Sequence, residues 1–259
     1  MKSLNFDNKV SLLYKSKSQK IRVLSENWFS QNMYCPCCGN IMLKKFKNNS
    51  PVADFYCEKC SEQFELKSTD RKIKNKIVDG AYETAINRVK SNSNPDLFVL
   101  QYKDFTVKNL MVIPKYFFTP DIIEKRKPLS STARRAGWVG SNILYEEIPE
   151  QGKIKIIVDG EIIPPEAVVE EYQKTKKLYV ENIEKRGWLI DVLSCVNLIN
   201  KNEFSLNEMY FYEQQLQKKH PGNNNVKQKI RQQLQFLRDK GFIAFMDNKG
   251  HYKKLGFNH

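Results

Sequence analysis

The first 180 residues alternate between helical and strand-like patterns of apolar positions. Ile21, Leu24 and Trp28 recur at helical spacing and predict a helix over residues 7–31, with Ser18 as an N-cap. Further elements are predicted at residues 81–90 (helix, with Asp79 near its start), 97–102, 105–113 and 153–158 (strands), and from Pro164-Pro165 onward (helix), with polar loops at 68–76 and 119–141. Strands interspersed with helices predict a mixed α+β fold.

The pattern changes after Arg186, where three amphipathic helices are followed by two short strands. The first has its apolar face at Trp188, Leu189, Val192, Leu193, Val196 and Ile199, and the third at Val226, Ile230, Leu234 and Leu237. Ser205 and Glu208 predict a capping box at the start of the second, and Asn224 can cap the third. Strands over 242–246 and 251–255 complete a predicted winged helix. We therefore divide the chain into residues 1–183 and 184–259.

The charge balance indicates a polyanionic partner. The 259 residues include 43 Lys and Arg against 29 Asp and Glu, a net charge of +14 with an isoelectric point near 9.4. Such an excess favours nucleic acid. No apolar run approaches the ~20 residues that a membrane span needs, and the N-terminus lacks the apolar core of a signal peptide. We expect a soluble, cytoplasmic monomer that binds no membrane.

The cysteines predict a zinc site. Cys35-x-x-Cys38 and Cys57-x-x-Cys60 have the spacing of four-cysteine structural zinc sites. The alternative is a set of buried free thiols, but cysteines in such polar surroundings are poor core formers. Cys37 is expected to be a bystander, because a ligand pair that includes it would distort the two-residue knuckle. A closed four-sulfur site leaves no open position for a substrate, so this zinc should be structural.

Three residues around the second cysteine pair predict a magnesium-dependent phosphodiesterase centre. Period-two alternation puts Glu65 and Lys67 on one face of a strand, with Phe64 on the other. Asp54 and Glu65 would bind Mg²⁺ together with the carbonyl of Leu66, and Lys67 would lie beside the attacking water. The alternative is a turn residue followed by an exposed strand face. The knuckle between the two acids is predicted to be the hairpin turn that brings them together.

Two segments are candidates for DNA contact. The outward face of the third C-terminal helix carries Lys227, Gln228, Lys229, Arg231, Gln232, Gln235 and Arg238, and the hairpin carries Lys249, Lys253 and Lys254. Glutamine and arginine contact base edges, and lysine neutralises phosphates, although many charged helix faces are only solvated. The loop around Arg134, Arg135 and Trp138 also suits nucleic acid, since tryptophan offers a flat apolar surface to a base. The sequence leaves open whether Trp138 is instead a core aromatic.

These motifs together resemble the DpnI type of methyl-directed (type IIM) restriction endonuclease: PVADFYC-x-x-C…FELK, the C-P-x-C-G knuckle, the KP-L-x-x-TARRAGW-x-G loop and the IRQQLQ-x-LRDK helix. The resemblance implies a PD-(D/E)xK nuclease domain over residues 1–183 with an embedded zinc knuckle, followed by a winged helix over 184–259. It also implies Mg²⁺-dependent cleavage of double-stranded DNA at GATC sites that contain N6-methyladenine. Composition and spacing alone predict only a metal-dependent, DNA-binding nuclease.

The same resemblance assigns roles to individual residues. Asp54, Glu65 and Lys67 fall on the catalytic motif, and Cys35, Cys38, Cys57 and Cys60 fall on the zinc ligands. The loop with Arg134, Arg135 and Trp138 would recognise the methylated site. Cys37 departs from the pattern. The rival hypothesis is a zinc-containing winged-helix regulator without catalytic activity.

Overall fold

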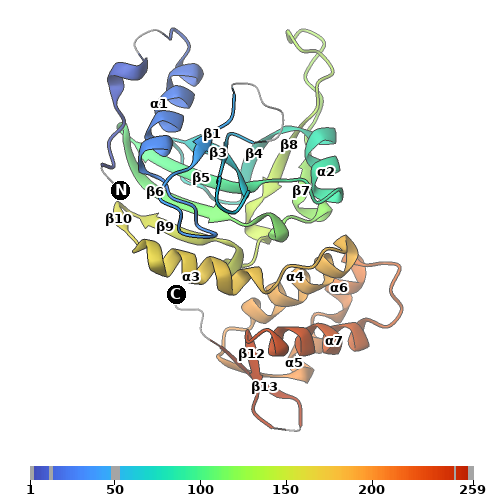
Figure 1. Ribbon diagram of the computed structural model, residues 1–259. Coiled ribbons are helices and arrows are strands. Elements are labelled where there is room, and N and C mark those ends of the chain that lie inside the picture. Colours follow the sequence, from blue (N-terminus) through green and yellow to red (C-terminus); the bar gives the residue numbers. More distant parts are fainter. Residues whose placement is uncertain (1–2, 12–13, 48–52, 248, 256–259) are drawn as a thin grey trace. The chain divides into compact units, whose positions relative to one another are not determined.

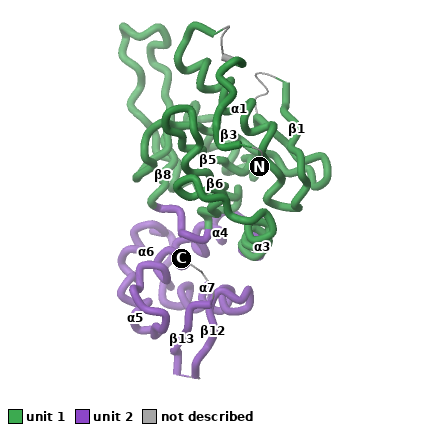
Figure 2. The backbone as a smooth tube through the Cα atoms, turned by 90° about the vertical axis from the view of Figure 1, so that its left-hand side faces the viewer, with its two compact units in different colours: residues 1–146, 152–175 green, residues 147–151, 176–259 purple. Residues whose placement is uncertain are grey.

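The computed structural model describes residues 3–11, 14–47, 53–247 and 249–255, which form two compact units. Unit 1 comprises residues 1–146 and 152–175, and unit 2 comprises residues 147–151 and 176–259 (Figure 2). Pro51 and Val52 of the predicted catalytic motif, and Asn248 of the predicted hairpin turn, lie outside the described residues. In the part of the chain that is described, no helix has the length and apolarity to cross a bilayer.

A mixed sheet is the frame of unit 1 (Figure 1). Its described strands are β1 (Lys44–Lys45), β2 (Phe55–Tyr56), β3 (Gln63–Thr69), β5 (Asp96–Lys103), β6 (Thr106–Ile113), β9 (Ile154–Val158) and β10 (Glu161–Ile162), in the order β1-β2-β3-β5-β6-β9-β10. Only β3 and β5 pair in parallel in this sheet; the other neighbours are antiparallel. Pro114 follows β6, as the sequence predicts, and Asp159 and Gly160 form the positive-φ turn between β9 and β10. The predicted mixed α+β fold is confirmed.

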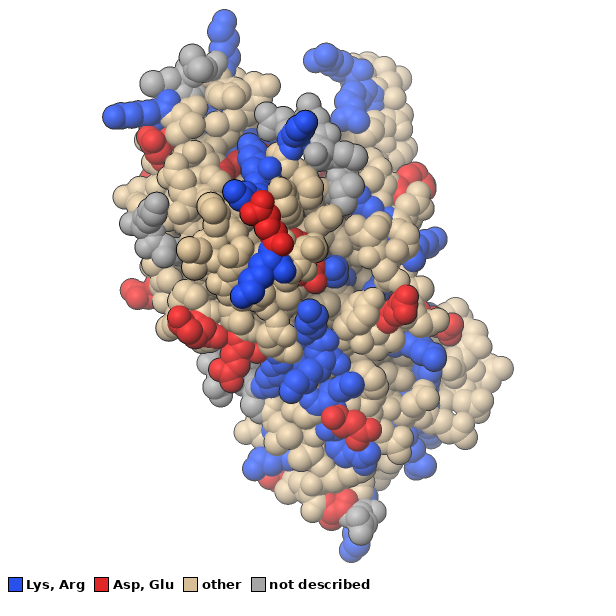
Figure 3. Space-filling model, in the orientation of Figure 1, with Lys and Arg blue, Asp and Glu red and all other residues tan. Residues whose placement is uncertain are grey.

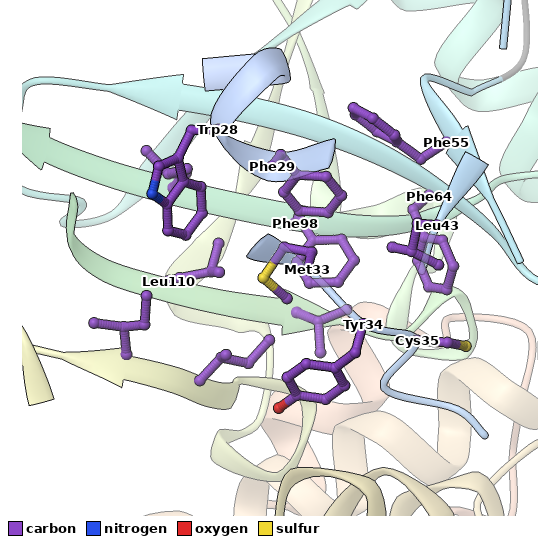
Figure 4. Close-up of a cluster of buried hydrophobic side chains, with 14 of the residues drawn as sticks. Trp28, Phe29, Met33, Tyr34, Cys35, Leu43, Phe55, Phe64, Phe98 and Leu110 are labelled. Carbon is purple, nitrogen blue, oxygen red and sulfur yellow. The ribbon is translucent and has the colours of Figure 1, made fainter. Parts of the chain in front are cut away.

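Helix α1 (Lys17–Asn32) covers this sheet through an aromatic cluster. Phe29 contacts Phe55 and Phe98 with ring centroids 4.6 and 4.7 Å away, and Phe64 lies 5.4 Å from Phe98 (Figure 4). All four rings are fully buried. Burial of aromatic side chains from α1, β2, β3 and β5 therefore stabilises the strands that carry the candidate site, at roughly 25 cal/mol per Å² of apolar surface.

The N-terminal helix is shorter than the predicted 7–31. A 3-10 turn covers Asn8–Ser11, and α1 begins after Ser16, not Ser18. The preceding chain follows the sheet instead: Phe6 N–H donates to the carbonyl of Phe105, and Val107 N–H donates to the carbonyl of Leu4. These hydrogen bonds hold the chain just before the predicted helix against β6 and the turn that precedes it.

A second, small sheet was not predicted. It consists of β4 (Lys76–Ala81), β8 (Gly140–Leu144) and β7 (Ile123–Lys125), in the order β4-β8-β7. Asp79 therefore lies in a strand, and α2 (Tyr82–Lys90) begins three residues later. The sequence pattern missed β4 because Ile77 is its only buried residue, which is too little alternation to identify a strand. Helix α3 (Pro165–Lys176) begins at the predicted proline pair.

Unit 2 contains the predicted helices and hairpin. Its helices are α4 (Ile183–Leu198), α5 (Leu206–Tyr210), α6 (Glu213–Lys219) and α7 (Val226–Asp239), and its sheet has the order β11-β13-β12 (Glu203–Ser205, His251–Lys254 and Ile243–Phe245). Both hydrogen bonds of the Ser205–Glu208 capping box are present. The predicted second helix is divided into α5 and α6. The residue before α7 is Asn225, not Asn224, and its side chain makes no capping bond.

Candidate active site and DNA-contacting surfaces

The four predicted zinc ligands come together in unit 1. The sulfur atoms of Cys35, Cys38, Cys57 and Cys60 all lie within 4.8 Å of one another. The Cys35–Cys60 and Cys38–Cys57 sulfur pairs are 3.5 and 3.6 Å apart. Four sulfurs around one zinc at ~2.3 Å are ~3.8 Å apart in an ideal tetrahedron, so this donor set fits the ion.

The pKa of one of the four cysteines, Cys57, favours the thiolate, whereas burial raises the pKa of Cys35 and of Cys60. Burial opposes ionisation of Cys57, but backbone N–H groups of Cys60 and Lys59 outweigh it and lower the pKa of the thiol to about 7. A thiolate is the form that binds zinc. Cys37 is buried and absent from the cluster, and its carbonyl accepts a hydrogen bond from the side chain of Gln173. In the structure Cys37 thus lies outside the four-sulfur group, and its role as a bystander stays a prediction.

The second knuckle is a hairpin turn, as predicted. Strands β2 and β3 pair antiparallel with Phe55 opposite Phe64, and Ser61 N–H donates to the carbonyl of Cys57. One residue before β2, Asp54 N–H donates to the carbonyl of Phe64 at 2.9 Å. The carboxylate of Asp54 then accepts the N–H of Leu66 at 2.8 Å. The hairpin therefore delivers Asp54 to the strand that carries the other two candidate residues.

Glu65 and Lys67 point to the same side of β3. Lys67 Nζ lies 2.8 Å from Glu65 Oε1, and both side chains are partly buried. The same ammonium lies 2.8 Å from Asp79 Oδ1 on β4. Asp79 is thus a member of the site that the sequence analysis did not identify. It lies twelve residues after Lys67 in a strand with almost no apolar alternation, so no local pattern marks it.

Burial and neighbouring charges shift the pKa values of Asp54, Lys67 and Asp79 in different directions. Burial raises the pKa of Asp54, the Leu66 N–H opposes this, and the charge of Glu65 raises it further. Burial lowers the pKa of Lys67, but Glu65 and Asp79 outweigh it and raise that pKa above its usual value. Burial likewise opposes ionisation of Asp79, yet Lys67 lowers its pKa overall. Asp54 and Glu65 repel each other, which is the condition that a bound cation relieves.

Helix α1 adds charged side chains near Asp54. Glu26 is 8% exposed and pairs with Arg22 at 2.6 Å and with Lys45 of β1 at 2.7 Å. In addition to burial, the charge of Glu26 raises the pKa of Asp54, and the charge of Arg22 opposes this. Ser25 and Ser68 link α1 to β3 through hydroxyl groups 3.1 Å apart. The sequence analysis missed these residues because the helical pattern shows only their spacing.

Two cavities adjoin the Glu65–Lys67–Asp79 group. One of about 200 Å³ is mostly apolar and includes Glu65, Asp79, Arg88 and Leu97 in its wall. The other, of about 300 Å³, is lined by Lys67, Ser68, Thr69, Arg71, Lys72, Ile73, Lys76, Ile77, Val78 and Val99. Its basic residues extend from Lys67 to the exposed segment that follows β3. This side of the site suits a phosphate backbone.

The loop between β7 and β8 (residues 126–139, here the β7–β8 loop) projects from the small sheet. In Figure 3, Lys and Arg side chains gather at the tip of this loop, at the upper right. Arg134 and Arg135 are exposed, and the Arg135 guanidinium lies 4.6 Å from the centre of the Trp138 ring. Trp138 is half-buried and is not part of the hydrophobic core of the described residues. One of the two alternatives for Trp138, a buried core aromatic, is therefore wrong.

The predicted faces of α7 are confirmed. Val226, Ile230, Leu234 and Leu237 are buried, whereas Lys227, Arg231, Gln232 and Gln235 are exposed and Lys229 is half-buried. The Arg231 side chain donates to the hydroxyl of Tyr210 at 2.6 Å, and Lys229 donates to Gln232 at 2.8 Å.

In the hairpin, only two of the three lysines proposed for phosphate contact are exposed. Lys249 and Lys253 face solvent. Lys254 instead donates to the carbonyl of Ile199 at 2.6 Å, within unit 2. The prediction that Lys254 contacts the DNA backbone is not supported by this geometry, because its ammonium group already holds the end of α4.

Comparison with known protein families identifies matches over almost the whole chain. The family model DpnI, described as the Dam-replacing family, matches residues 2–181. The model of the Dam-replacing HTH domain matches residues 184–254.

Proposed function

Since the chain belongs to the Dam-replacing (DpnI) family, we propose that it is a Mg²⁺-dependent, methyl-directed type II restriction endonuclease. It hydrolyses phosphodiester bonds of double-stranded DNA at GATC sites that contain N6-methyladenine. Residues 1–183 form the catalytic domain, residues 184–259 form the winged-helix DNA-binding domain, and the protein acts as a monomer.

The observation that supports this proposal most is the arrangement of Asp54, Glu65 and Lys67. Asp54 accepts the N–H of Leu66, the residue between Glu65 and Lys67, and burial and the charge of Glu65 raise the pKa of Asp54. The carboxylate of Glu65 pairs with the Lys67 ammonium, and one wall of the adjoining cavity is basic. Asp54, Glu65 and the carbonyl of Leu66 would hold Mg²⁺. Magnesium, when bound, supplies an activated water and neutralises charge on the phosphoryl oxygens.

The chain's own residues contribute position and charge. Lys67 keeps its proton near neutral pH, because its two carboxylate neighbours raise its pKa. Its ammonium group can therefore orient a water or stabilise negative charge on the phosphate. The Leu66 N–H donates to one carboxylate oxygen of Asp54 and so restricts the rotation of this side chain. The hairpin geometry therefore sets the position of the other carboxylate oxygen. Zinc held by the four cysteines would keep that hairpin closed.

Methyl dependence needs more than one contact. Burying one methyl group contributes on the order of 1 kcal/mol, about fivefold. Two surfaces that each bind methylated adenine would multiply their preferences. The β7–β8 loop and α7 are the two candidates, through Arg134, Arg135 and Trp138 in the loop and Lys227, Lys229, Arg231, Gln232 and Gln235 on the helix.

Trp138→Ala is expected to lower the ratio of cleavage rates on methylated over unmethylated DNA by about fivefold, the value of one lost methyl contact. The ratio is measured with one plasmid prepared in both methylation states. Phe105→Leu, a change at a part-exposed aromatic on the β5–β6 turn, should leave the ratio unchanged. An unaltered ratio for Trp138→Ala would remove the tryptophan from methyl recognition.

Arg231→Ala is expected to weaken binding to a methylated GATC duplex by about 1–3 kcal/mol, or fivefold to 150-fold, if it contacts a base edge. Binding is measured without Mg²⁺ so that no DNA is cut. Lys240→Ala removes an exposed cation just beyond α7 and serves as the control. Equal losses for the two variants would mean that α7 supplies only general charge.

A digest tests the proposal as a whole. The protein with Mg²⁺ should cut plasmid grown with adenine methylation at GATC and leave unmethylated plasmid intact. If it binds the methylated duplex but cuts neither plasmid, the proposal is wrong and the chain is a DNA-binding regulator with an inert acidic cluster.

A further inference from the structure

The ion pair between Asp79 and Lys67 joins two different sheets of unit 1. Lys67 lies in β3 of the large sheet, and Asp79 lies in β4 of the small one (Figure 1). The side chains are only 20% and 14% exposed, so solvent screens this pair less than a surface pair. Lysine has a long flexible side chain, and two acceptors at 2.8 Å, Glu65 and Asp79, restrict where its ammonium group lies.

The backbone of β4 explains why Asp79 points at Lys67. The pairing of β4 with β8 is regular up to Asp79 opposite Ser141, and then shifts so that Ala81 lies opposite Gly140. Such a bulge re-aims the side chains beside it. The buried hydroxyl of Ser141 donates to the carbonyl of Gly80 at 3.1 Å and lies 3.5 Å from Asp79 Oδ2. One oxygen of Asp79 thus faces Lys67, and the other faces Ser141.

Asp54, Glu65 and Asp79 do not form a tight three-carboxylate group in this structure. Within the described ranges, one group of three or more Cys, His, Asp or Glu residues has all its ligand atoms within 4.8 Å of one another. That group is the four cysteines. Asp54, Glu65 and Asp79 do not meet that condition. The contact that the structure gives Asp79 inside the site is with the lysine.

Strand β8 also anchors the β7–β8 loop. Arg126 N–H donates to the carbonyl of Gly140 at 2.9 Å, and Lys125 lies opposite Ser141. The Trp138 ring packs directly on Gly140, where a Cβ atom would lie 2.8 Å from the ring. Trp138 is therefore in direct contact with Gly140, the residue adjacent to Ser141.

We propose that Asp79 is a positioning residue that holds Lys67 against Glu65 and ties this position to the strand that carries the β7–β8 loop. The inference rests on the proposed nuclease function. Contact of the loop with its DNA site sets β8, and β8 with Ser141 sets the carboxylate that holds the lysine. Correct loop contact is then coupled to correct placement of Lys67.

Asp79→Asn keeps the shape of the side chain and removes its charge. We expect the single-turnover cleavage rate on methylated DNA to fall by about 10- to 100-fold, the scale of a misplaced catalytic group. DNA affinity without Mg²⁺ should change by less than about twofold, because the contacts of Asp79 are with Lys67 and Ser141 inside unit 1. In a Lys67→Ala background, Asp79→Asn should have no further effect, because its action runs through the lysine. The ratio of rates on methylated over unmethylated DNA should also fall.

Glu124→Gln is the matched control. Glu124 lies on β7 of the same small sheet and pairs with Lys76 at 2.6 Å in a more exposed ion pair, so its neutralisation removes a carboxylate charge from that sheet without touching Lys67. Its cleavage rate should stay at the parent value. Rates are compared at a temperature at which circular dichroism shows every variant folded. If Asp79→Asn is too unstable, Asp79→Glu, which shifts the carboxylate by one methylene, takes its place and should also slow cleavage.

The outcomes separate this inference from the proposed function. If the unmodified protein cuts no DNA, the proposed function is wrong and this inference falls with it. If the unmodified protein cuts and Asp79→Asn cuts equally fast, Asp79 is not a positioning residue. The same holds if Asp79→Asn slows cleavage by the same factor in the parent and in the Lys67→Ala background. In both cases the nuclease proposal stands. A loss that depends on Lys67 but leaves the methylation ratio unchanged overturns the link to the loop.

Discussion

Lys67→Ala and Asp54→Ala should each slow single-turnover cleavage of methylated plasmid by at least about 10²-fold, to a low but measurable residual rate, while DNA binding persists. Lys67 is the only ammonium group paired with Glu65 among the described residues, and removing a charge that stabilises a transition state costs about 10²- to 10³-fold in rate. Loss of Asp54 removes a carboxylate from the candidate magnesium site, which we expect to cost several kcal/mol of the barrier, or at least about 10³-fold. Cleavage is followed under single-turnover conditions with saturating enzyme.

Two measurements make this result specific. Affinity for the methylated duplex, taken without Mg²⁺, should be unchanged in both variants. Lys103→Ala replaces an exposed lysine of β5 in the same sheet and should cut at the parent rate. If Lys67→Ala or Asp54→Ala retains the parent rate, the assigned catalytic centre is wrong even though the family membership stands.

Removing zinc should unfold or loosen residues 1–183. The four cysteines connect the chain before β1 to the β2–β3 hairpin, and structural zinc contributes on the order of 10 kcal/mol of folding free energy in small domains. Treatment with a chelator is expected to lower the thermal midpoint and change the circular dichroism spectrum. Cleavage should also be lost when Mg²⁺ is in excess, since the hairpin no longer holds Asp54 against β3.

Single cysteine variants give the matched comparison. Cys57→Ala should lose bound zinc, measured as metal per chain, and unfold at lower temperature. Cys37→Ala should retain one zinc per chain, because Cys37 lies outside the four-sulfur group. A circular dichroism spectrum and thermal midpoint that are unchanged after complete zinc removal would show that the metal has no structural role.

Secondary structure was predictable where side-chain periodicity is strong and local. The apolar face of α7, the capping box at Ser205 and the strands β5 and β6 each follow from patterns within one segment. The prediction was wrong where pairing with distant chain changes the local preference. The residues before α1 pair with the sheet, and β4 exists because β8 offers it a partner.

In the candidate site, too, the residues placed by local patterns were predicted, and those brought in by contacts between distant segments were not. Local geometry places the two sulfurs of each C-x-x-C pair and the two charged groups of Glu65-x-Lys67, since a knuckle and a strand each have a fixed repeat. Asp79 and Glu26 join the site through strand pairing and helix packing across separate elements. Lys254 donates a hydrogen bond to the carbonyl of Ile199, 55 residues earlier in the chain, and this contact cannot be read from the sequence.

The amino-acid sequence by itself predicted the two cysteine pairs of the four-sulfur group, the hairpin that brings Asp54 to the strand of Glu65 and Lys67, and the exposed face of α7. Each depends on residues whose relative positions are set by the backbone repeat over a short stretch. Only the tertiary structure decided what surrounds the lysine. Its second carboxylate comes from another sheet, and its link to the β7–β8 loop runs through Ser141 on a strand more than seventy residues away. Contacts between elements depend on how sheets pack, and no spacing along the chain encodes that.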